Sequence, residues 1–303
     1  EMQLLRRVKK MLAVADNLSE EMQDSQDCTV GVARKLPEPN LVKTSWKDGQ
    51  VFSLQDDPDR TKQPFDLPLF VHNKDPLSQK IEVEHLYLPW FGHDTRCHAV
   101  MVHNVLTHAE CVALIDCINA KGFTPALLNV GGGRQQLFQG VRDGWRCIFD
   151  SEQFASYLLS VLQPHLPEEW DGRTLSDINE RCRVLCYTPQ QQNSAHYDGI
   201  YCRSPPHLRA GDESRITIQL YLNTIPEEYG GATTLLDGRS ARRKCGFLRS
   251  AQRGNPIACQ PRAGSCLLFS QNIYHEGSEL LDGYKYTLRT EAMYSDNPHP
   301  TVC

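Results

Sequence analysis

Three side chains that can bind a metal stand in the second half of the chain. His196 and Asp198 lie two residues apart in the segment Ser194-Ala-His-Tyr-Asp198, and a second histidine, His275, follows downstream in His275-Glu-Gly277. Side chains on a strand repeat every two residues, so His196 and Asp198 would project from the same face if their segment is a strand. One imidazole and one carboxylate could then reach the same metal ion.

His275 is the best candidate for the third ligand. It follows the apolar run Cys266-Leu-Leu-Phe269 and precedes a turn at Asp282-Gly283, so a strand folded back would bring it opposite His196 and Asp198. Two histidines and one carboxylate occupy one face of an octahedron and leave the other positions open, which is the ligand set of non-haem Fe(II) oxygenases. Zinc is the rival metal for the same ligands. A lone His-x-Asp is common by chance, and the indication comes from the order of the elements around it.

Motifs of one known family surround these ligands. Along the chain they are Arg183-Val-Leu-Cys-Tyr187, His196-Tyr-Asp198, Arg215-Ile-Thr-Ile-Gln-Leu-Tyr-Leu-Asn223, Gly230-Gly-Ala-Thr233, Pro261-Arg-Ala-Gly264, Cys266-Leu-Leu-Phe269, His275-Glu-Gly277 and Gly283-Tyr-Lys285. With them, the segment from about Cys97 to Asp296 resembles the catalytic domain of the iron- and 2-oxoglutarate-dependent dioxygenases, and is most similar to their prolyl 4-hydroxylase-like branch. The likeness covers about two thirds of the chain, and the combination is specific although no single motif is.

The resemblance implies an α+β fold, a double-stranded β-helix (jelly-roll barrel) with flanking helices. It also implies an Fe(II)- and 2-oxoglutarate-dependent dioxygenase that hydroxylates a C–H bond and releases succinate and carbon dioxide. His196, Asp198 and His275 would bind Fe(II), 2-oxoglutarate and dioxygen would be the partners, and ascorbate is a candidate accessory cofactor. A peptidyl, prolyl-type substrate is expected ahead of a small molecule, and nucleic acid is not expected as a partner. The alternatives are a small metabolite, a free amino acid or a nucleobase as substrate, or a non-catalytic metal-binding jelly-roll module.

The same resemblance assigns a cation to the cosubstrate. Lys285 stands ten residues after His275, where the family has a basic residue that pairs with the distal carboxylate of 2-oxoglutarate, and a charge-assisted bond in a dry barrel is strong. Thr287 and Arg289 lie on the same strand face as Lys285. Arg289 could share or take over the role, since some branches of the superfamily use an arginine placed later.

Hydroxyl donors to the same carboxylate are expected from two further residues. Tyr187 lies nine residues before His196, and Thr217 lies four before Tyr221, which are the places where the prolyl hydroxylase-like enzymes have such donors. Both could instead be core residues with satisfied hydroxyls, as most barrel Tyr and Thr residues are.

One arginine is a candidate for contact with the substrate. Arg142, in Val141-Arg-Asp-Gly-Trp145, resembles the family's V-R segment that lines the substrate groove. The small polar residue that usually follows is replaced here by Asp143-Gly144-Trp145, which is a departure from a proline-peptide enzyme. The loops 129–145 and 199–214 would decide between an open peptide groove and a closed small-molecule pocket.

The chain is expected to divide into an N-terminal extension, 1–95, a dioxygenase domain, 96–296, and a tail, 297–303. An amphipathic helix is expected within residues 1–22. Gly131-Gly-Gly133 lacks the Lys-Ser/Thr of a P-loop and is interpreted as a flexible loop. A basic loop at Arg239–Lys244 is interpreted as solvated, with an acidic peptide or nucleic-acid contact as the alternative.

Two helices should precede the strands of the domain. The first starts at a capping box of Thr107 and Glu110 and ends at Lys121-Gly122, and the second runs from about Ser151 to Leu162. Alternating runs rich in β-branched residues predict strands at 98–102, 182–187, 195–201, 215–223, 232–236, 256–260, 265–270 and 284–294. Many strands at short spacing indicate a closed or sandwiched antiparallel sheet.

Composition bounds the surroundings of the protein. The 303 residues carry a formal net charge of −5, which argues against a surface that grips nucleic acid over its whole area. Mean hydropathy is −0.47, and no apolar run reaches the ~18–20 residues that a membrane span needs. Twelve cysteines are scattered without a C-x-x-C. Most are expected as buried thiols, which favours the cytoplasm, and the endoplasmic reticulum stays open if an upstream signal was removed.

Overall fold

The computed structural model describes residues 36–53, 64–65, 80–92, 96–238 and 255–296. By its contacts the chain divides into Glu1–Pro37 and Glu38–Cys303, and the following concerns the second unit. The helix expected in residues 1–22 and the basic loop Arg239–Lys244 lie outside the described residues. The expected domain limits therefore stay a prediction.

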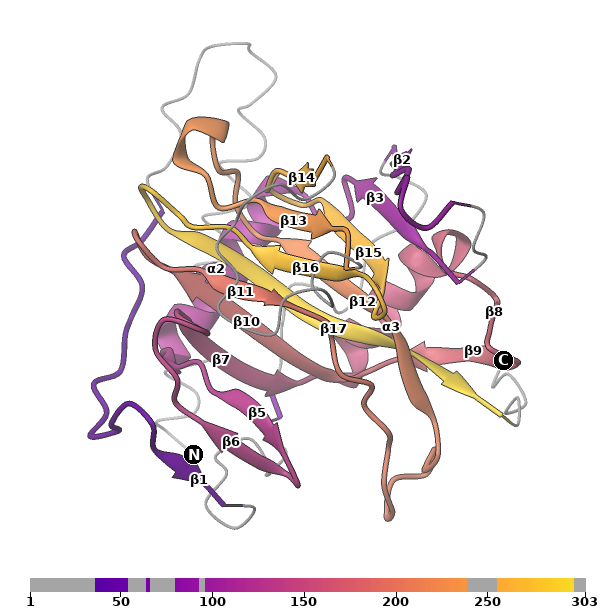
Figure 1. The fold of residues 1–303 in the computed structure, drawn as a ribbon, viewed down its shortest axis with the longest axis horizontal. Helices are drawn as coiled ribbons and strands as arrows, with labels where there is room; N and C mark the ends of the chain where they lie inside the picture. The colour runs from indigo at the N-terminus through magenta and orange to yellow at the C-terminus, as the bar shows by residue number, and fades with distance from the viewer. Residues whose placement is uncertain (1–35, 54–63, 66–79, 93–95, 239–254, 297–303) are drawn as a thin grey trace, which may run out of the picture. The chain divides into compact units, whose positions relative to one another are not determined.

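Two antiparallel sheets form the centre of the fold (Figure 1). The larger one contains β10 (Arg181–Tyr187), β17 (Lys285–Ser295), β12 (Glu213–Tyr221) and β15 (Cys266–Ser270), side by side in this order. The smaller one contains β11 (Asn193–His196), β16 (Tyr274–Gly277), β13 (Thr233–Leu236) and β14 (Ile257–Cys259). From β10 to β17 the chain passes repeatedly between the two sheets, which is the winding of a double-stranded β-helix. The predicted fold is confirmed.

Apolar side chains from both sheets meet between them. Leu235 and Cys259 of the smaller sheet share one buried cluster with Tyr221, Leu267 and Phe269 of the larger sheet. Their strands are rich in β-branched and aromatic residues, which suit a pleated surface buried on its inner face. This cluster holds the two sheets together on the side of the barrel away from the β10 edge.

Further strands widen the larger sheet at both edges. On one side β15 pairs with β3 (Ala99–His103), and β3 pairs with β2 (Glu82–His85); on the other, β10 pairs with β7 (Trp145–Asp150) and β7 with β4 (Thr124–Pro125). The end of β17 also pairs with β9 (Arg173–Ile178), whose hairpin partner is β8 (Glu169–Trp170). A separate small sheet consists of β1 (Val51–Phe52), β6 (Arg134–Gln136) and β5 (Leu128–Gly131).

Two helices cover the larger sheet on the side away from the smaller one (Figure 1). Helix α2 (His108–Lys121) starts at the predicted capping box, in which the Glu110 N–H donates to Thr107 Oγ1 and the Thr107 N–H donates to Glu110 Oε2. Helix α3 (Glu152–Leu162) is capped by Ser151, whose Oγ accepts from the Phe154 N–H. Short 3₁₀ turns lie at Gln163–His165 (η3) and Glu227–Tyr229 (η4).

Two sequence-based expectations need correction. The strand predicted over 195–201 ends at His196, because the chain then leaves the sheet and Asp198 lies beyond the last strand residue. The glycines Gly131-Gly-Gly133 belong to the end and turn of the β5–β6 hairpin, where all three have positive φ, rather than to an irregular loop. Strand β7 was not expected at all, since Trp145–Asp150 shows no clear alternation.

The described cysteines and helices agree with the composition. The nine described cysteines are free thiols, and six of them are buried: Cys111, Cys147, Cys182, Cys186, Cys259 and Cys266. No described helix is long and apolar enough to cross a bilayer.

Candidate active site

The pairing of β11 with β16 brings the two predicted histidine ligands together. His196 and His275 are direct register partners, and their ring centroids lie 4.4 Å apart. Asp198 Oδ1 lies 3.4 Å from His196 Nε2 and 3.8 Å from His275 Nε2. One ligand atom from each residue falls within 4.8 Å of the others, so a single ion fits among them with two nitrogens and one oxygen on one side.

Backbone carbonyls orient both imidazoles. His196 Nδ1 lies 2.8 Å from the Ser194 carbonyl oxygen, and His275 Nδ1 lies 3.0 Å from that of Ile273. A carbonyl oxygen only accepts, so Nδ1 carries the hydrogen in each ring and Nε2 keeps its lone pair for a metal. Burial also lowers the pKa of His275 to about 4, which keeps this ring neutral and able to bind a metal at neutral pH.

Asp198 is held as a carboxylate by two neighbours from the larger sheet. Its side chain is 1% exposed, and Oδ1 lies 2.9 Å from Arg289 Nη2. Oδ2 accepts a hydrogen bond of 2.6 Å from Thr217 Oγ1. Burial opposes ionisation, but Arg289 and the two histidines outweigh it and hold the pKa of the carboxyl well below its usual range. Asp198 therefore offers an ionised carboxylate oxygen, which is the type of ligand that a hard metal ion prefers.

Lys285 lies buried at the other end of the barrel, at the start of β17. It is 4% exposed, it is paired in register with Tyr187, and its Nζ lies 5.5 Å from the centre of the Tyr187 ring. Among the described residues no carboxylate forms an ion pair with it. Burial alone lowers its pKa to about 7, because no neighbouring negative charge offsets the desolvation of the ammonium.

A glycine makes room beside Lys285. Gly231 has φ +68°, and a Cβ there would lie 3.0 Å from Leu280 Cδ1 and 3.6 Å from Lys285 Cδ. The walls around it are apolar, with Leu185, Tyr187, Ile225 and Leu280 in one buried cluster. Such a lining fits a compact anion with an apolar body. Lys285 supplies one positive charge, and the apolar side chains around it keep water away from the ligand.

The other predicted cosubstrate residues are placed differently. Thr287 is 2% exposed and stands between Lys285 and Arg289 on the inner face of β17. The Thr217 hydroxyl donates to Asp198, so in this structure it orients a metal ligand. Arg289 is committed to Asp198 at 2.9 Å and approaches Glu291 Oε1 at 3.9 Å. Of the two candidate cations, Lys285 is thus the one without a protein carboxylate among the described residues.

Arg142 lies against the same Tyr187, close to the candidate metal ligands. It forms an isolated bridge with Asn193, its charge interacts with Tyr187, Arg289 and Asp198, and burial lowers its pKa. The departure Asp143-Gly144-Trp145 has a steric reason. Gly144 has φ +96°, and a Cβ there would lie 3.0 Å from the Tyr187 ring and 3.1 Å from the Cys186 carbonyl oxygen, so a larger residue would displace Tyr187.

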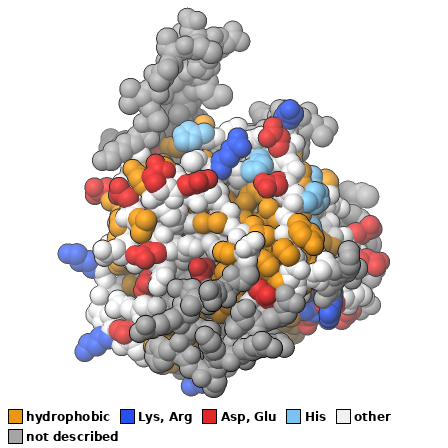
Figure 2. Space-filling view, turned by 45° about the horizontal axis from the view of Figure 1, so that its top comes forward, with side chains coloured by type: hydrophobic (Ala, Val, Ile, Leu, Met, Phe, Trp, Pro, Cys, Tyr) orange, Lys and Arg blue, Asp and Glu red, His pale blue; other side chains and the backbone are white. Residues whose placement is uncertain are grey.

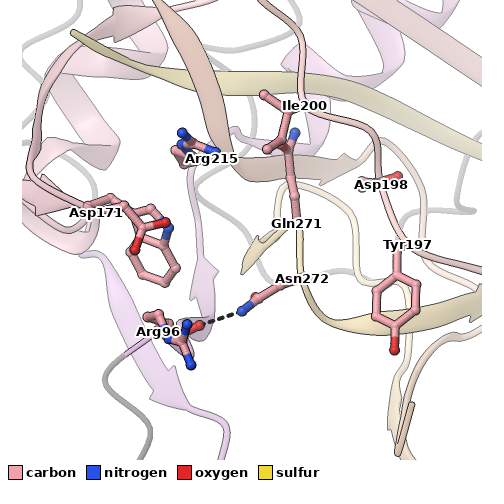
Figure 3. Close-up of a pocket in the computed structure, with 9 residues that line it drawn as sticks. Arg96, Asp171, Tyr197, Asp198, Ile200, Arg215, Gln271 and Asn272 are labelled. Atoms are coloured by element: carbon pink, nitrogen blue, oxygen red, sulfur yellow. Dashed lines mark hydrogen bonds between the residues drawn. The ribbon is translucent and has the colours of Figure 1, made fainter. Parts of the chain in front are cut away.

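A cavity of about 510 Å³ adjoins Asp198 (Figure 3). Its described lining comes from the segment 197–200, the β8–β9 hairpin, the turn between β15 and β16, strand β12 and the residues before β3: Arg96, Trp170, Asp171, Tyr197, Asp198, Ile200, Arg215, Gln271 and Asn272. In Figure 3 the Tyr197 ring points away from Arg215 and Asp171 on the opposite wall. This cavity is the space from which a substrate could approach the metal ligands.

Apart from Asp198, the sequence analysis assigned no role to the residues of this lining. Trp170 ends β8 and Asp171, at φ +51°, begins the two-residue turn to β9, and the pairing of β9 with the end of β17 brings that hairpin near Asp198. Gln271 had a usable signal, because it directly follows the buried strand β15 and precedes His275 by four residues. Polar residues at strand ends near a ligand are candidates for substrate contact.

Residues 182–290 match the family model of the 2OG-Fe(II) oxygenase superfamily. No curated protein matches the chain. Similar solved structures include a collagen prolyl hydroxylase of Paramecium Bursaria Chlorella virus-1 in complex with 2-oxoglutarate, at 16% identity and TM-score 0.42 over 64% of this chain and 95% of that one. A prolyl-4-hydroxylase of Pseudomonas putida has 17% identity and TM-score 0.42 over 64% and 91%.

A third similar structure is a prolyl hydroxylase of Trichoplax adhaerens in complex with a peptide fragment of the hypoxia inducible factor oxygen degradation domain. It has 16% identity and TM-score 0.45 over 65% of this chain and 83% of that one. The residues that match the family model include His196, Asp198 and His275.

Proposed function

The chain carries a 2OG-Fe(II) oxygenase domain at residues 182–290, and from this premise we propose which residues perform the reaction and on what. His196, Asp198 and His275 hold Fe(II), and Lys285 binds the distal carboxylate of 2-oxoglutarate. The assignment rests on one observation. A single barrel contains three side chains that could bind one metal ion and a buried lysine without a described carboxylate partner. When bound, Fe(II) and 2-oxoglutarate supply the oxidation, and the enzyme is a dioxygenase.

The protein residues have three tasks in this proposal. Arg289 and Thr217 keep the Asp198 carboxylate ionised and pointed at the histidines. Lys285, with the Tyr187 hydroxyl and Thr287 near it, orients the cosubstrate from the far end. Arg142 lies where it can meet an oxygen of the substrate or of the cosubstrate, because it is a buried cation beside Asp198 and Tyr187. Ascorbate stays a prediction.

We propose a peptidyl, prolyl-type substrate. Support comes from the rim that follows the metal ligand, where Tyr197, Ile200 and Tyr201 are 47%, 55% and 43% exposed. Large apolar groups left exposed together beside a cavity are typical of surfaces that bind another molecule. On the face seen in Figure 2, Lys and Arg side chains lie among Asp and Glu side chains and hydrophobic ones gather between them, which favours a peptide over nucleic acid.

A small molecule is the second candidate substrate. The cavity beside Asp198 measures about 510 Å³, which is within the ~300–1,000 Å³ of small-molecule sites. A metabolite or free amino acid would be enclosed there between Trp170 and Gln271, without use of the exposed rim. The two candidates therefore differ in whether Tyr197, Ile200 and Tyr201 matter for binding.

An anaerobic titration with Fe(II) and 2-oxoglutarate tests the cofactor residues. We expect the weak visible charge-transfer band of a chelated ketoacid in the wild type, no band in Asp198→Ala, and a band shifted to much higher 2-oxoglutarate in Lys285→Ala. A peptide and metabolite screen for gain of one oxygen atom by mass follows. Well-folded, metal-loaded protein without a band would refute the cofactor assignment, and turnover of metabolites alone would refute the peptide.

A further inference from the structure

The segment from Asp198 to the first two residues of strand β12 is folded back on itself. Residues 199–214 form a tight excursion in which the Arg203 N–H donates to the Asp212 carbonyl at 2.9 Å and the Gly211 N–H donates to the Arg203 carbonyl at 2.9 Å. Nearer the barrel, the Ser214 N–H donates to the Tyr201 carbonyl, and the Tyr201 N–H donates to Ser214 Oγ at 2.7 Å. This segment carries Ile200, one wall of the cavity.

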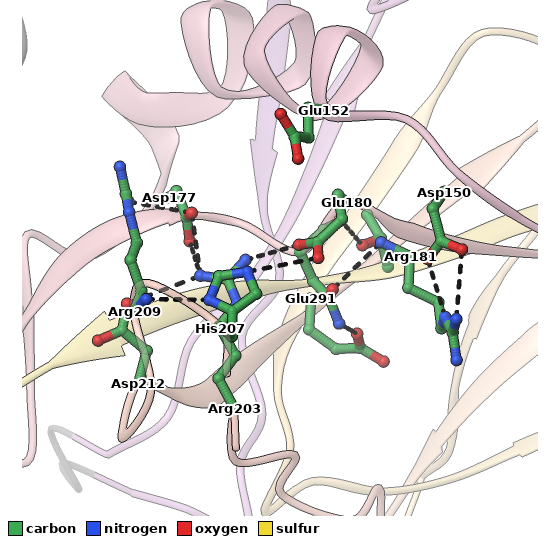
Figure 4. A network of polar contacts seen from close by, with 12 residues as sticks. Asp150, Glu152, Asp177, Glu180, Arg181, Arg203, His207, Arg209, Asp212 and Glu291 are labelled. Atoms are coloured by element: carbon green, nitrogen blue, oxygen red, sulfur yellow. Dashed lines mark hydrogen bonds and ion pairs between the residues drawn. The ribbon is translucent and has the colours of Figure 1, made fainter. Parts of the chain in front are cut away.

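Arg203 ties this segment to β9 and the turn after it (Figure 4). Its side chain is 2% exposed, and Nη1 lies 2.7 Å from Asp177 Oδ1 and 2.9 Å from Asp177 Oδ2. Nη2 lies 2.9 Å from Glu180 Oε2, and Asp212 Oδ2 is 3.6 Å from Nη1. Three carboxylates from three different segments thus surround one buried guanidinium.

The partners of Arg203 are themselves held in place. Asp212 Oδ2 accepts a hydrogen bond of 2.7 Å from Ser176 Oγ. Arg209, from the same excursion, lies 3.0 Å from Asp177 Oδ2 and donates to the Ser176 carbonyl. A buried planar guanidinium with several carboxylates in hydrogen-bond range defines one geometry, because each displaced bond leaves a buried charge unpaired.

We propose that Arg203 is a positioning residue of the oxygenase, which locks residues 199–214 and thereby holds Ile200 in place in the wall of the substrate cavity. The inference rests on the proposed function only in the use of that cavity. The metal side is held independently, since Asp198 is fixed by Arg289 and Thr217 from β17 and β12. Loss of Arg203 should therefore loosen the wall while the metal ligands keep their places.

Hydrogen exchange with full-length Arg203→Gln and Arg203→Lys tests this. The matched control is Arg181→Gln, which breaks another double hydrogen bond of an arginine, from Arg181 to Asp150 on neighbouring strands, and leaves the ion pairs of Arg203 in place. In Arg203→Gln the amides of Tyr201, Arg203, Gly211 and Ser214 should exchange at least about tenfold faster than in the wild type. Arg203→Lys should restore part of the protection, and Arg181→Gln should leave these four amides unchanged.

Two readouts separate positioning from a merely structural role. The Fe(II)/2-oxoglutarate band should keep its midpoint within about twofold in Arg203→Gln, since neither ligand set includes the excursion. With a substrate from the screen, KM should rise about tenfold or more while kcat changes little. Wild-type exchange of the four amides in Arg203→Gln would overturn the proposal, and so would an unchanged KM.

Failure of folding is covered by a second variant. If Arg203→Gln does not fold, Asp177→Asn keeps the arginine and removes one charge from its partners, and the same four amides should exchange faster. Absence of the band in every variant, the wild type included, would refute the proposed function. The exchange result would then test by itself whether Arg203 holds residues 199–214 in place.

Discussion

Lys285 and Arg203 are both almost fully buried cations, yet their surroundings are opposite. Lys285 is 4% exposed and has no described carboxylate partner, whereas Arg203 is 2% exposed and lies among three carboxylates. Carboxylates of the protein neutralise the charge of Arg203. The charge of Lys285 has no such described partner inside its apolar wall, which is costly unless a ligand supplies the anion.

The difference separates a structural charge from a binding charge. Around Arg203 every partner belongs to a segment that it ties down, so removal of the arginine should act on stability and on the position of residues 199–214. Around Lys285 the wall contains Tyr187, Leu280 and Gly231, where a Cβ would lie 3.6 Å from Lys285 Cδ, so removal of the lysine should act on affinity. The following predictions test that division.

The largest effect is expected from Arg203→Met. It removes the cation that Asp177, Glu180 and Asp212 share, of which Asp212 is 2% exposed while Asp177 keeps Arg209, and breaking a buried pair typically costs ~3–5 kcal/mol. Urea unfolding followed by circular dichroism measures the free energy of unfolding. Arg181→Met, whose pair with Asp150 is more exposed, is the control and should cost less. If Arg203→Met lowers the free energy of unfolding by less than about 1 kcal/mol, the ion pairs of Arg203 contribute no more than those at a protein surface.

Lys285→Met should act on the cosubstrate and spare the fold. A hydrogen bond to a charged group contributes ~1.5–3 kcal/mol, so the Kd for 2-oxoglutarate should rise roughly 10- to 150-fold. Calorimetric titration of the Fe(II)-loaded protein measures it, and Lys285→Arg, which keeps the charge, should lose less. If the Kd stays within twofold while Arg289→Gln raises it, the distal carboxylate is bound by Arg289 instead.

The affinity for 2-oxoglutarate should depend on pH through Lys285. Its pKa of about 7 in the free protein means that the ammonium is present below pH 7 and is lost as the pH rises. The carboxylates of 2-oxoglutarate stay ionised throughout, so the Kd should be flat below pH 7 and rise by up to about tenfold per pH unit above it. Titrations between pH 6 and about 9 measure the slope, and Lys285→Met should abolish it.

The smallest effect is expected from Tyr187→Phe. The ring stays beside Lys285 Nζ and only the hydroxyl is removed, which should cost ~0.5–1.5 kcal/mol because Lys285 still neutralises the carboxylate. The Kd for 2-oxoglutarate should therefore rise about 2- to 12-fold. An unchanged Kd would assign the Tyr187 hydroxyl to the core and remove it from the cosubstrate residues.

Local patterns predicted much of the fold. The capping box of Thr107 and Glu110, the period-two runs of β12 and β17, and the buried run of β15 each depend on neighbours in the chain, so sequence spacing was sufficient. Strand β7 was missed because its partner β10 lies far along the chain, and β5, β6, β8 and β9 were missed because they show no clear alternation of apolar and polar residues. Their hydrogen bonds, rather than their residue types, define them.

The residue types of the candidate site could be found in the sequence, but their division of tasks could not. His196 and Asp198 were predicted from the period of two, His275 from the order of the elements, and Lys285 from the resemblance to the family, since period two and motif order survive in the chain. Only the tertiary structure decided that Arg289 and Thr217 serve Asp198, that Lys285 has no described carboxylate partner, and that Arg203 meets three carboxylates. Those pairings depend on strand register and on segments far apart in the sequence. Whether a buried charge has an oppositely charged partner is decided by the side chains that the fold brings next to it.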